Sequence, residues 1–151
     1  MKKQLAGMFT ITLLSTASIP SIAGVDPGLA VLWKGQAQYQ ATVDNKLDPS
    51  GHTVSALNLT ISADGKVVGN SPENGCSLLG IATLTPSPSR VDLDLTMSGC
   101  RYAGYNMRWS GSIAVVSKGQ AGTVAQLNLN TGILGVGRWR AIYDLKATLS
   151  H

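Results

Sequence analysis

The feature that most constrains the fold of this chain is an alternation of apolar and polar residues. From Arg90 to Ser98 every second residue is apolar, and the residues between are polar or charged. A period of two places the two sets on opposite faces of an extended strand. One face can then pack on a core while the other meets water, which is typical of an antiparallel sheet. Eight segments fit this description, and none is typical of a helix.

Turn-forming residues separate these segments. Ala63-Asp64-Gly65 tolerates the positive φ of a hairpin, and the two prolines of segment 86–89 enforce a turn. Because closing an eight-stranded meander removes the sheet edges, we expect an all-β fold. The favoured form is an antiparallel up-and-down barrel, and the alternative is a β-sandwich. The expected strands are Val31–Val43, His52–Ser62, Lys66–Gly69, Cys76–Leu84, Arg90–Ser98, Met107–Val116, Thr123–Asn130 and Arg138–Leu149.

Residues 1–23 are typical of a signal peptide. A basic start at Lys2 and Lys3 precedes a short apolar run, and small residues follow up to Ala23. This order predicts a bacterial-type leader cut before Gly24. The expected cut carries no cysteine for a lipid anchor, and the apolar run is short for a membrane helix. We therefore expect one domain over residues 24–151, in the periplasm or outside the cell.

Two cysteines, Cys76 and Cys100, are the only ones in the chain. An even number without a CxxC spacing, in an exported chain, predicts a structural disulfide. The pair lies symmetrically about Pro88, so a hairpin folded there brings the two together. Gly75 and Gly99 precede them and ease a close approach of the two backbones.

That symmetry also predicts a register for this hairpin. It pairs Leu79 with Met97 and Ile81 with Leu95 on the inner face. On the outer face it leaves an apolar set beside two acidic residues: Leu78, Ala82 and Leu84 beside Asp92 and Asp94. An apolar outer stripe is a candidate surface for a partner. The alternative is a slip of the register, or a terminus that covers the stripe.

Composition argues against several classes of function. Lys2 and Lys3 supply two of the 12 basic residues, against eight acidic ones, so the rest of the chain is nearly neutral. It lacks the basic run that a nucleic-acid partner needs. The two histidines, His52 and His151, form no zinc motif, and the glycines of segment 132–137 have the wrong spacing for a phosphate loop. We expect no enzyme activity, no cofactor, no metal and no integral membrane segment.

Candidate binding residues gather at one end of the expected barrel. Alternate connections of a meander share an end, and the longer ones (44–51, 70–75, 99–106 and 130–137) share one mouth. Loops on a rigid scaffold and barrel mouths are common binding sites, where Trp, Tyr and Arg are enriched. The predicted ligand- or partner-binding residues are Tyr102, Tyr105, Trp109, Trp139, Arg101 and Arg108. The alternative is that the aromatic residues fill one end of the core.

A basic strip is a second candidate. If the first and last strands pair, Lys34, Arg138, Arg140 and Lys146 share an outer face. Such a strip suits an acidic partner, or is a solvated surface.

Strand count and strand length resemble the calycins, the group of lipocalin- and avidin-like barrels. Lipocalin-like barrels pack a tryptophan of the first strand against an arginine of the last, and here Trp33 and Arg138 or Arg140 occupy those strands. The chain departs from the pattern at Val31, where the family has glycine. The resemblance implies an architecture and no particular ligand.

Together these observations favour an exported, non-enzymatic binding protein. Its barrel mouth engages a small apolar ligand or a protein partner, with inhibition as one form of such binding. Low charge and many Ser, Thr, Gly and Ala residues also suit a surface or fimbrial subunit. A small outer-membrane barrel is the third hypothesis, although the C-terminus lacks the expected aromatic residue.

Overall fold

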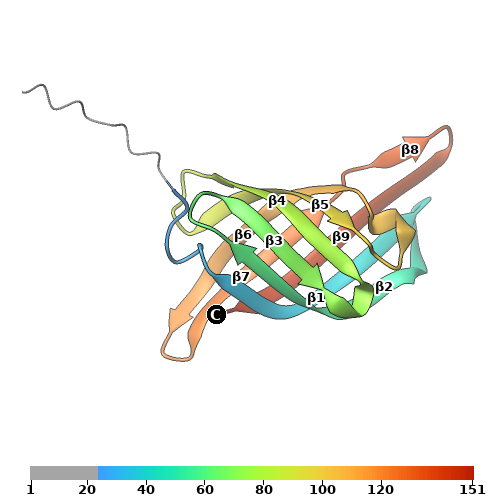
Figure 1. Cartoon of the computed structure of the whole chain (residues 1–151). Coiled ribbons are helices and arrows are strands. Elements are labelled where there is room, and N and C mark those ends of the chain that lie inside the picture. The colour runs from blue at the N-terminus through green and yellow to red at the C-terminus, as the bar shows by residue number, and fades with distance from the viewer. Residues whose placement is uncertain (1–23) are drawn as a thin grey trace, which may run out of the picture.

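The computed structural model describes residues 24–151, so the expected signal peptide lies outside the described residues. The described chain is a barrel of antiparallel strands (Figure 1). The strands are β1 (Leu32–Val43), β2 (Lys46–Ile61), β3 (Lys66–Ser71), β4 (Cys76–Leu84), β5 (Arg90–Ser98), β6 (Arg108–Gly119), β7 (Gly122–Asn130), β8 (Leu134–Val136) and β9 (Trp139–Ser150). Two short 3₁₀ helices interrupt the connections, η1 (Pro72–Asn74) and η2 (Ala103–Tyr105).

Eight of these strands close the barrel. Neighbours from β1 to β7 pair in chain order, β7 pairs with β9, and β9 pairs back with β1. The eight-stranded antiparallel barrel predicted from the sequence is therefore confirmed. The short strand β8 pairs with β9 alone and lies outside the barrel. It was not predicted, because segment 130–137 was expected to be a loop.

Alternation places the side chains as predicted along β5. Val91, Leu93, Leu95 and Met97 are buried, and Asp92 is exposed. Bulky residues from other strands, and one from η2, also fill the interior. The largest fully buried side chains are Trp33, Trp109, Tyr39 and Tyr105. The barrel thus has a packed core rather than a pore.

The predicted register between β4 and β5 is wrong by one residue. Leu78, not Leu79, lies opposite Met97, and Ile81 lies opposite Asp94. Leu78 is consequently buried, whereas Leu79 and Ile81 point outward. A slip of one residue exchanges the two faces of a strand. Because β4 carries apolar residues on both faces, its pattern did not fix which face is inside.

The predicted disulfide between Cys76 and Cys100 is confirmed, with a Cα–Cα distance of 4.2 Å. Gly75 and Gly99 lie back to back beside it, both with φ of +72°. A Cβ on Gly75 would stand 2.9 Å from the carbonyl oxygen of Gly99. The two glycines therefore permit the close backbone approach that the crosslink requires.

Residues 24–31 close one end of the barrel. Val25 and Leu29 are buried in the core, and the indole N–H of Trp33 donates to the Leu29 carbonyl at 3.1 Å. The Trp33 ring packs edge-on against His151, with centroids 4.7 Å apart. Arg140 lies at the other end of β9, beside the end of β1. The expected packing of Trp33 against Arg138 or Arg140 is therefore wrong, although the barrel architecture itself agrees with the calycin resemblance.

The two ends of the barrel differ in their connections. Residues 24–31 and the connections β2–β3, β4–β5 and β6–β7 share the N-terminal end. The other four connections share the opposite end, which we call the loop-rich end (Figure 1). Among residues 24–151, no helix is long and apolar enough to cross a membrane.

Candidate functional site at the loop-rich end

The structure divides the six predicted site residues into three groups. Tyr105 and Trp109 lie inside the barrel, and Tyr102 covers them from the loop between β5 and β6. Trp139 lies outside, on the hairpin formed by β8 and β9. The remaining two residues, Arg101 and Arg108, are exposed. They therefore do not form one continuous pocket.

Five aromatic rings fill the barrel at this end. Tyr105 stands at their centre, with ring centroids 4.6 Å from Tyr102, 5.5 Å from Tyr39, 5.4 Å from Tyr143 and 5.7 Å from Trp109. Most of these pairs are tilted or edge-on, the arrangements that aromatic quadrupoles favour. We call these five residues the aromatic plug. Tyr39 and Tyr143 were not among the predicted residues.

Hydrogen bonds fix the aromatic plug in place. The Trp109 indole N–H donates to the Tyr105 carbonyl at 3.0 Å, and the Tyr105 hydroxyl donates to the Gly51 carbonyl. Burial first, and nearby charge and tyrosine hydroxyls second, raise the pKa of the Tyr105 phenol. Tyr105 therefore stays a neutral donor, as the bond to a carbonyl oxygen requires. The buried hydroxyl of Tyr39 has no partner among the described residues.

Gly51 permits this arrangement. The register of β1 with β2 shifts between Tyr39 and Ala41, which brings Gly51 against the plug. A Cβ at this position would stand 2.5 Å from the Ala41 Cβ and 3.0 Å from the Tyr105 hydroxyl. Only glycine fits here without displacing these neighbours.

Tyr102 and Asp48 form the outer edge of the plug. The Tyr102 hydroxyl donates to Asp48 Oδ2 at 2.8 Å, and the Ser50 hydroxyl donates to Asp48 Oδ1 at 2.6 Å. These donors, Ser50 first and Tyr102 second, lower the pKa of the Asp48 carboxyl. Burial, followed by the bond to Asp48, raises the pKa of Tyr102. Neutral Tyr102 and Tyr105 thus close this end of the barrel, and the Asp48 carboxylate lies at their outer edge.

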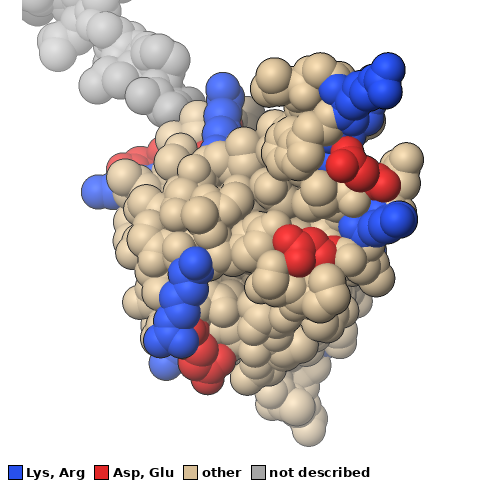
Figure 2. Space-filling view, turned by 90° about the vertical axis from the view of Figure 1, so that its right-hand side faces the viewer, with Lys and Arg blue, Asp and Glu red and all other residues tan. Residues whose placement is uncertain are grey.

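The two predicted arginines point away from the plug. Arg108 lies on the outer face of β6 and forms an ion pair with Asp94 through two nitrogens, with Arg108 Nε 2.7 Å from Asp94 Oδ1. Arg101 follows the disulfide, and its backbone N–H donates to the Asn74 carbonyl at 2.9 Å. Viewed from this end, the surface is largely uncharged, and its charged side chains stand singly or in small groups (Figure 2).

The hairpin of β8 and β9 projects beyond the barrel (Figure 1). Val136 lies opposite Trp139, and Gly137, with φ of +65°, makes the turn between them. Val136 is 83% exposed, Ile133 is 72% exposed and Trp139 is 43% exposed. Exposed apolar side chains that lie together on one element mark a candidate contact surface. We call residues 131–140 the arm.

The base of the arm is held by the turn between β1 and β2. The backbone N–H of Asp44 donates to the Arg140 carbonyl at 2.7 Å, and the Arg140 N–H donates to the Asp44 carboxylate at 2.9 Å. Asp44 and Asn45 both have positive φ, as a two-residue turn of this kind requires. A cavity of about 180 Å³ lies between this turn and Ile133. The arm is therefore anchored at its base and free at its tip.

The predicted basic strip is not continuous. Lys34 lies opposite Ser150, at the far end of β9 from Arg140. Asp144 stands between Lys146 and Arg140 on the outer face. Only Arg138 and Arg140 remain together, and both belong to the arm.

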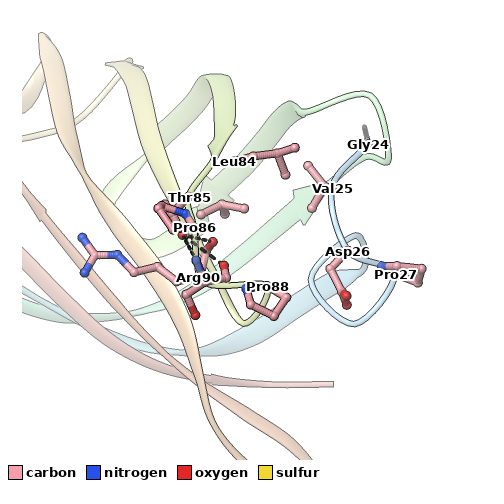
Figure 3. Close-up of a pocket in the computed structure, with 11 residues that line it drawn as sticks. Gly24, Val25, Asp26, Pro27, Leu84, Thr85, Pro86, Pro88 and Arg90 are labelled. Atoms are coloured by element: carbon pink, nitrogen blue, oxygen red, sulfur yellow. Dashed lines mark hydrogen bonds between the residues drawn. The ribbon is translucent and has the colours of Figure 1, made fainter. Parts of the chain in front are cut away.

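The larger cavities lie at the opposite, N-terminal end. One of about 380 Å³ lies between residues 24–27 and the β4–β5 turn, with Val25 and Leu84 among its walls (Figure 3). A second of about 540 Å³ shares these two residues. The Thr85 hydroxyl bonds within the turn, to the Arg90 carbonyl at 2.9 Å, and the Arg90 guanidinium pairs with Asp92. These polar groups are therefore not directed at a ligand.

The side chains exposed at the loop-rich end can form apolar contacts, hydrogen bonds and ion pairs with another molecule. Among residues 24–151, no three His, Cys, Asp or Glu side chains lie close enough together to hold a metal ion. The arm offers aliphatic and indole surface with two guanidinium groups, and the plug offers one carboxylate rim. Such groups suit recognition of another surface.

Sequence reasoning placed segment 130–137 at the binding mouth as a loop and rejected its glycines as a phosphate loop, but it did not predict the projecting hairpin of the arm. The signal was present, since Ile133, Leu134 and Val136 are aliphatic residues in a link that should be polar. It also missed Asp48 and Gly51, for which no pattern in the sequence gives a signal.

Comparisons with protein-family models, with curated proteins and with solved structures each found no match to this chain.

Proposed function

We propose that this chain is an exported, non-enzymatic binding protein that engages a protein partner with its arm. The observation that carries the proposal is the exposure of Val136, Ile133 and Trp139 on an element that pairs only with β9. Burial of such side chains in a partner's groove would be favourable, and Trp and Arg are the residues that most often dominate binding energy. Of the predicted residues, Trp139 is the one that lies in the arm.

A protein partner is favoured over a small apolar ligand. In barrels that hold a small molecule, the interior behind the mouth is open to it. Here Tyr105 and Trp109 occupy that interior and are fully buried. A projecting hairpin instead suits insertion into a concave surface, as long loops of some binding proteins do. Where that surface is an active site, binding inhibits the enzyme.

Export is supported by the Cys76–Cys100 disulfide, because such bonds persist in oxidising compartments. An aqueous setting is supported by the outer faces of β1 and β9, which carry Lys34, Gln36, Gln38 and Lys146. A lipid-facing band would place apolar side chains there. Membership of the calycins remains part of the proposal and adds no ligand to it.

The test is capture of proteins by the purified, immobilised chain from the periplasmic and culture fractions of the source cells. Quantitative mass spectrometry compares the wild type with Ile133→Ser/Val136→Ser and with Trp139→Ala. Val54→Ser is the matched control, because Val54 is also exposed and lies on the outer face of β2, away from the arm.

We expect a protein that the wild type and Val54→Ser retain and that both arm variants lose by at least tenfold. Equal capture by all four proteins, or no protein captured by the wild type, overturns the proposal. A fifth protein, Tyr102→Phe, tests the plug. Loss of capture in this variant, with capture retained by both arm variants, overturns the proposal and places the binding site at the plug.

A further inference from the structure

A second apolar surface lies on the outer wall of the barrel, away from the arm. Leu79 and Ile81 on β4 are 58% and 57% exposed, and Val68 lies directly opposite Leu79 on β3. These three residues, which we call the β4 stripe, are neighbours on the outer face of two adjacent strands. Single exposed aliphatic residues are ordinary, but contiguous ones on a sheet face indicate a contact surface.

Opposite charges stand on the two sides of the β4 stripe. Lys66 on β3 lies directly opposite Ile81, and Asp94 on β5 lies opposite the same residue from the other side. Strands are spaced about 4.8 Å apart, so the lysine and the aspartate flank Ile81 about 10 Å from each other. The outward residues of β4 itself, Ser77 to Thr83, are all uncharged. The row is therefore positive, apolar and negative in order.

This arrangement of charges on the two sides of the β4 stripe is complementary to that of a second copy related by a twofold rotation. A twofold axis that lies in the contact plane and runs along β4 exchanges the two sides of the strand. It sets Ile81 and Leu79 of one copy against the same residues of the other. It also places Lys66 of each copy over Asp94 of the other, which makes two symmetric ion pairs. A self-complementary patch of this kind is what a closed twofold dimer requires.

We propose that the β4 stripe is the interface of a homodimer. Two barrels are convex, so their surfaces separate on both sides of β4, and the long Lys66 side chain spans the widening gap. Asp94 already accepts two hydrogen bonds from Arg108, but a carboxylate has about four acceptor positions and can serve a second cation. A narrow contact of this type gives a weak, concentration-dependent dimer rather than an obligate one.

The dimer is independent of the arm. The β4 stripe lies on β3 and β4, whereas the arm continues β9 at the loop-rich end. A closed twofold contact also ends growth at two copies, which separates this proposal from a polymerising subunit.

Sedimentation velocity of the purified protein, from low micromolar to near-millimolar concentration, tests the proposal. The wild type should shift from monomer to dimer as concentration rises. Leu79→Lys/Ile81→Lys should remain monomeric throughout, because it places four like charges in the contact. The control Val54→Lys, on the outer face of β2, should dimerise as the wild type does. A wild type that stays monomeric, or a control that loses the dimer as well, overturns the proposal.

The ion pairs are tested by mixing two variants, which avoids dependence on any one substitution. Lys66→Asp alone and Asp94→Lys alone each place like charges over one another, and each dimer should weaken roughly tenfold. Mixed in equal amounts, the two variants form both ion pairs in a heterodimer, one with the native polarity and one reversed, and association should recover. No recovery in the mixture contradicts the twofold axis along β4. Capture of a different protein by the β4 stripe, with no dimer, also overturns the proposal.

Discussion

The aromatic plug and the arm lie at the same end of the barrel and use the same residue types in opposite ways. Trp109 is fully buried, and its indole N–H is bonded to the Tyr105 carbonyl. Trp139 is 43% exposed on a hairpin that only β9 supports. The first closes the barrel, and the second extends beyond it. Aromatic residues that look alike in the sequence are thus separated into a stabilising set and a set available for contact.

The difference shows what decides the role of such a residue. A ring that enters the barrel removes its surface from water once, during folding, and so contributes to stability. A ring held outside keeps that surface for a later contact. Tyr105 reaches the interior because η2 directs it inward and Gly51 leaves room for its hydroxyl. The following predictions test this division between inside and outside.

A large effect is expected from Leu78→Ala on β4. Leu78 is buried opposite Met97, so its truncation leaves a cavity and should cost about 2–5 kcal/mol of unfolding free energy. Leu79→Ala is the matched control on the outer face and should change the unfolding free energy by less than about 0.5 kcal/mol. Urea unfolding at low protein concentration measures both. A larger loss of unfolding free energy in Leu79→Ala than in Leu78→Ala would contradict this register and support the one expected from the sequence.

Loss of the disulfide should come next. Cys76→Ser/Cys100→Ser frees a loop with a sequence separation of 24 residues, which should cost about 3 kcal/mol on the chain-entropy model. The crosslink lies beside the loop that carries the plug, so the protection of amide protons in residues 99–107 should fall first. Hydrogen exchange by mass spectrometry locates the change. Equal loss of protection in the arm would show that the plug and the arm are one cooperative unit.

Tyr105→Phe should have an intermediate effect. The ring remains, but the buried Gly51 carbonyl loses its donor, which should cost about 1–3 kcal/mol. Capture of a partner through the arm should be unchanged in this variant. Denaturant unfolding and the capture assay together separate the two roles, and loss of capture without loss of stability would place Tyr105 in the binding site.

How far the sequence predicted this structure depends on how many faces of each strand are apolar. On β5 one face is apolar and the other polar, so alternation alone predicted the strand and which of its side chains are buried. On β4, Leu78 and Leu79 are both apolar, so alternation did not show which of them points inward, and the predicted register was wrong by one residue. This error did not affect the prediction of a closed barrel, because that prediction rests on the number and order of the strands.

The site was less predictable, for a physical reason. Tyr102 and Tyr105 lie in a loop, where no periodicity says whether a side chain points inward. The contacts of Asp48 and Gly51 with these tyrosines span 54 residues of sequence and arise only in the folded barrel. Trp139 has the same alternation as the inward residues Ala141 and Tyr143, but β9 begins outside the barrel and pairs with β1 only from Ala141 onward.

The smallest effect concerns pH. The folded protein lowers the pKa of Asp48 below its ordinary value of 3.8, so the unfolded chain binds more protons in that range. This contribution to stability is present above about pH 4 and is lost as the pH falls through the folded pKa. Asp48→Asn should therefore make the acid limb of the stability profile shallower, and Tyr102→Phe should do so in part. An unchanged acid limb in both variants would contradict the hydrogen bond between Tyr102 and Asp48 at the outer edge of the plug.

The central claim is that Trp109 belongs to the barrel and Trp139 to a contact surface. The same substitution at both positions tests it most directly, by urea unfolding of the purified protein. Trp109→Ala should lose about 3–5 kcal/mol of unfolding free energy, because it empties the core. Trp139→Ala should lose less than about 1 kcal/mol. Losses of equal size at the two positions would contradict the division between plug and arm.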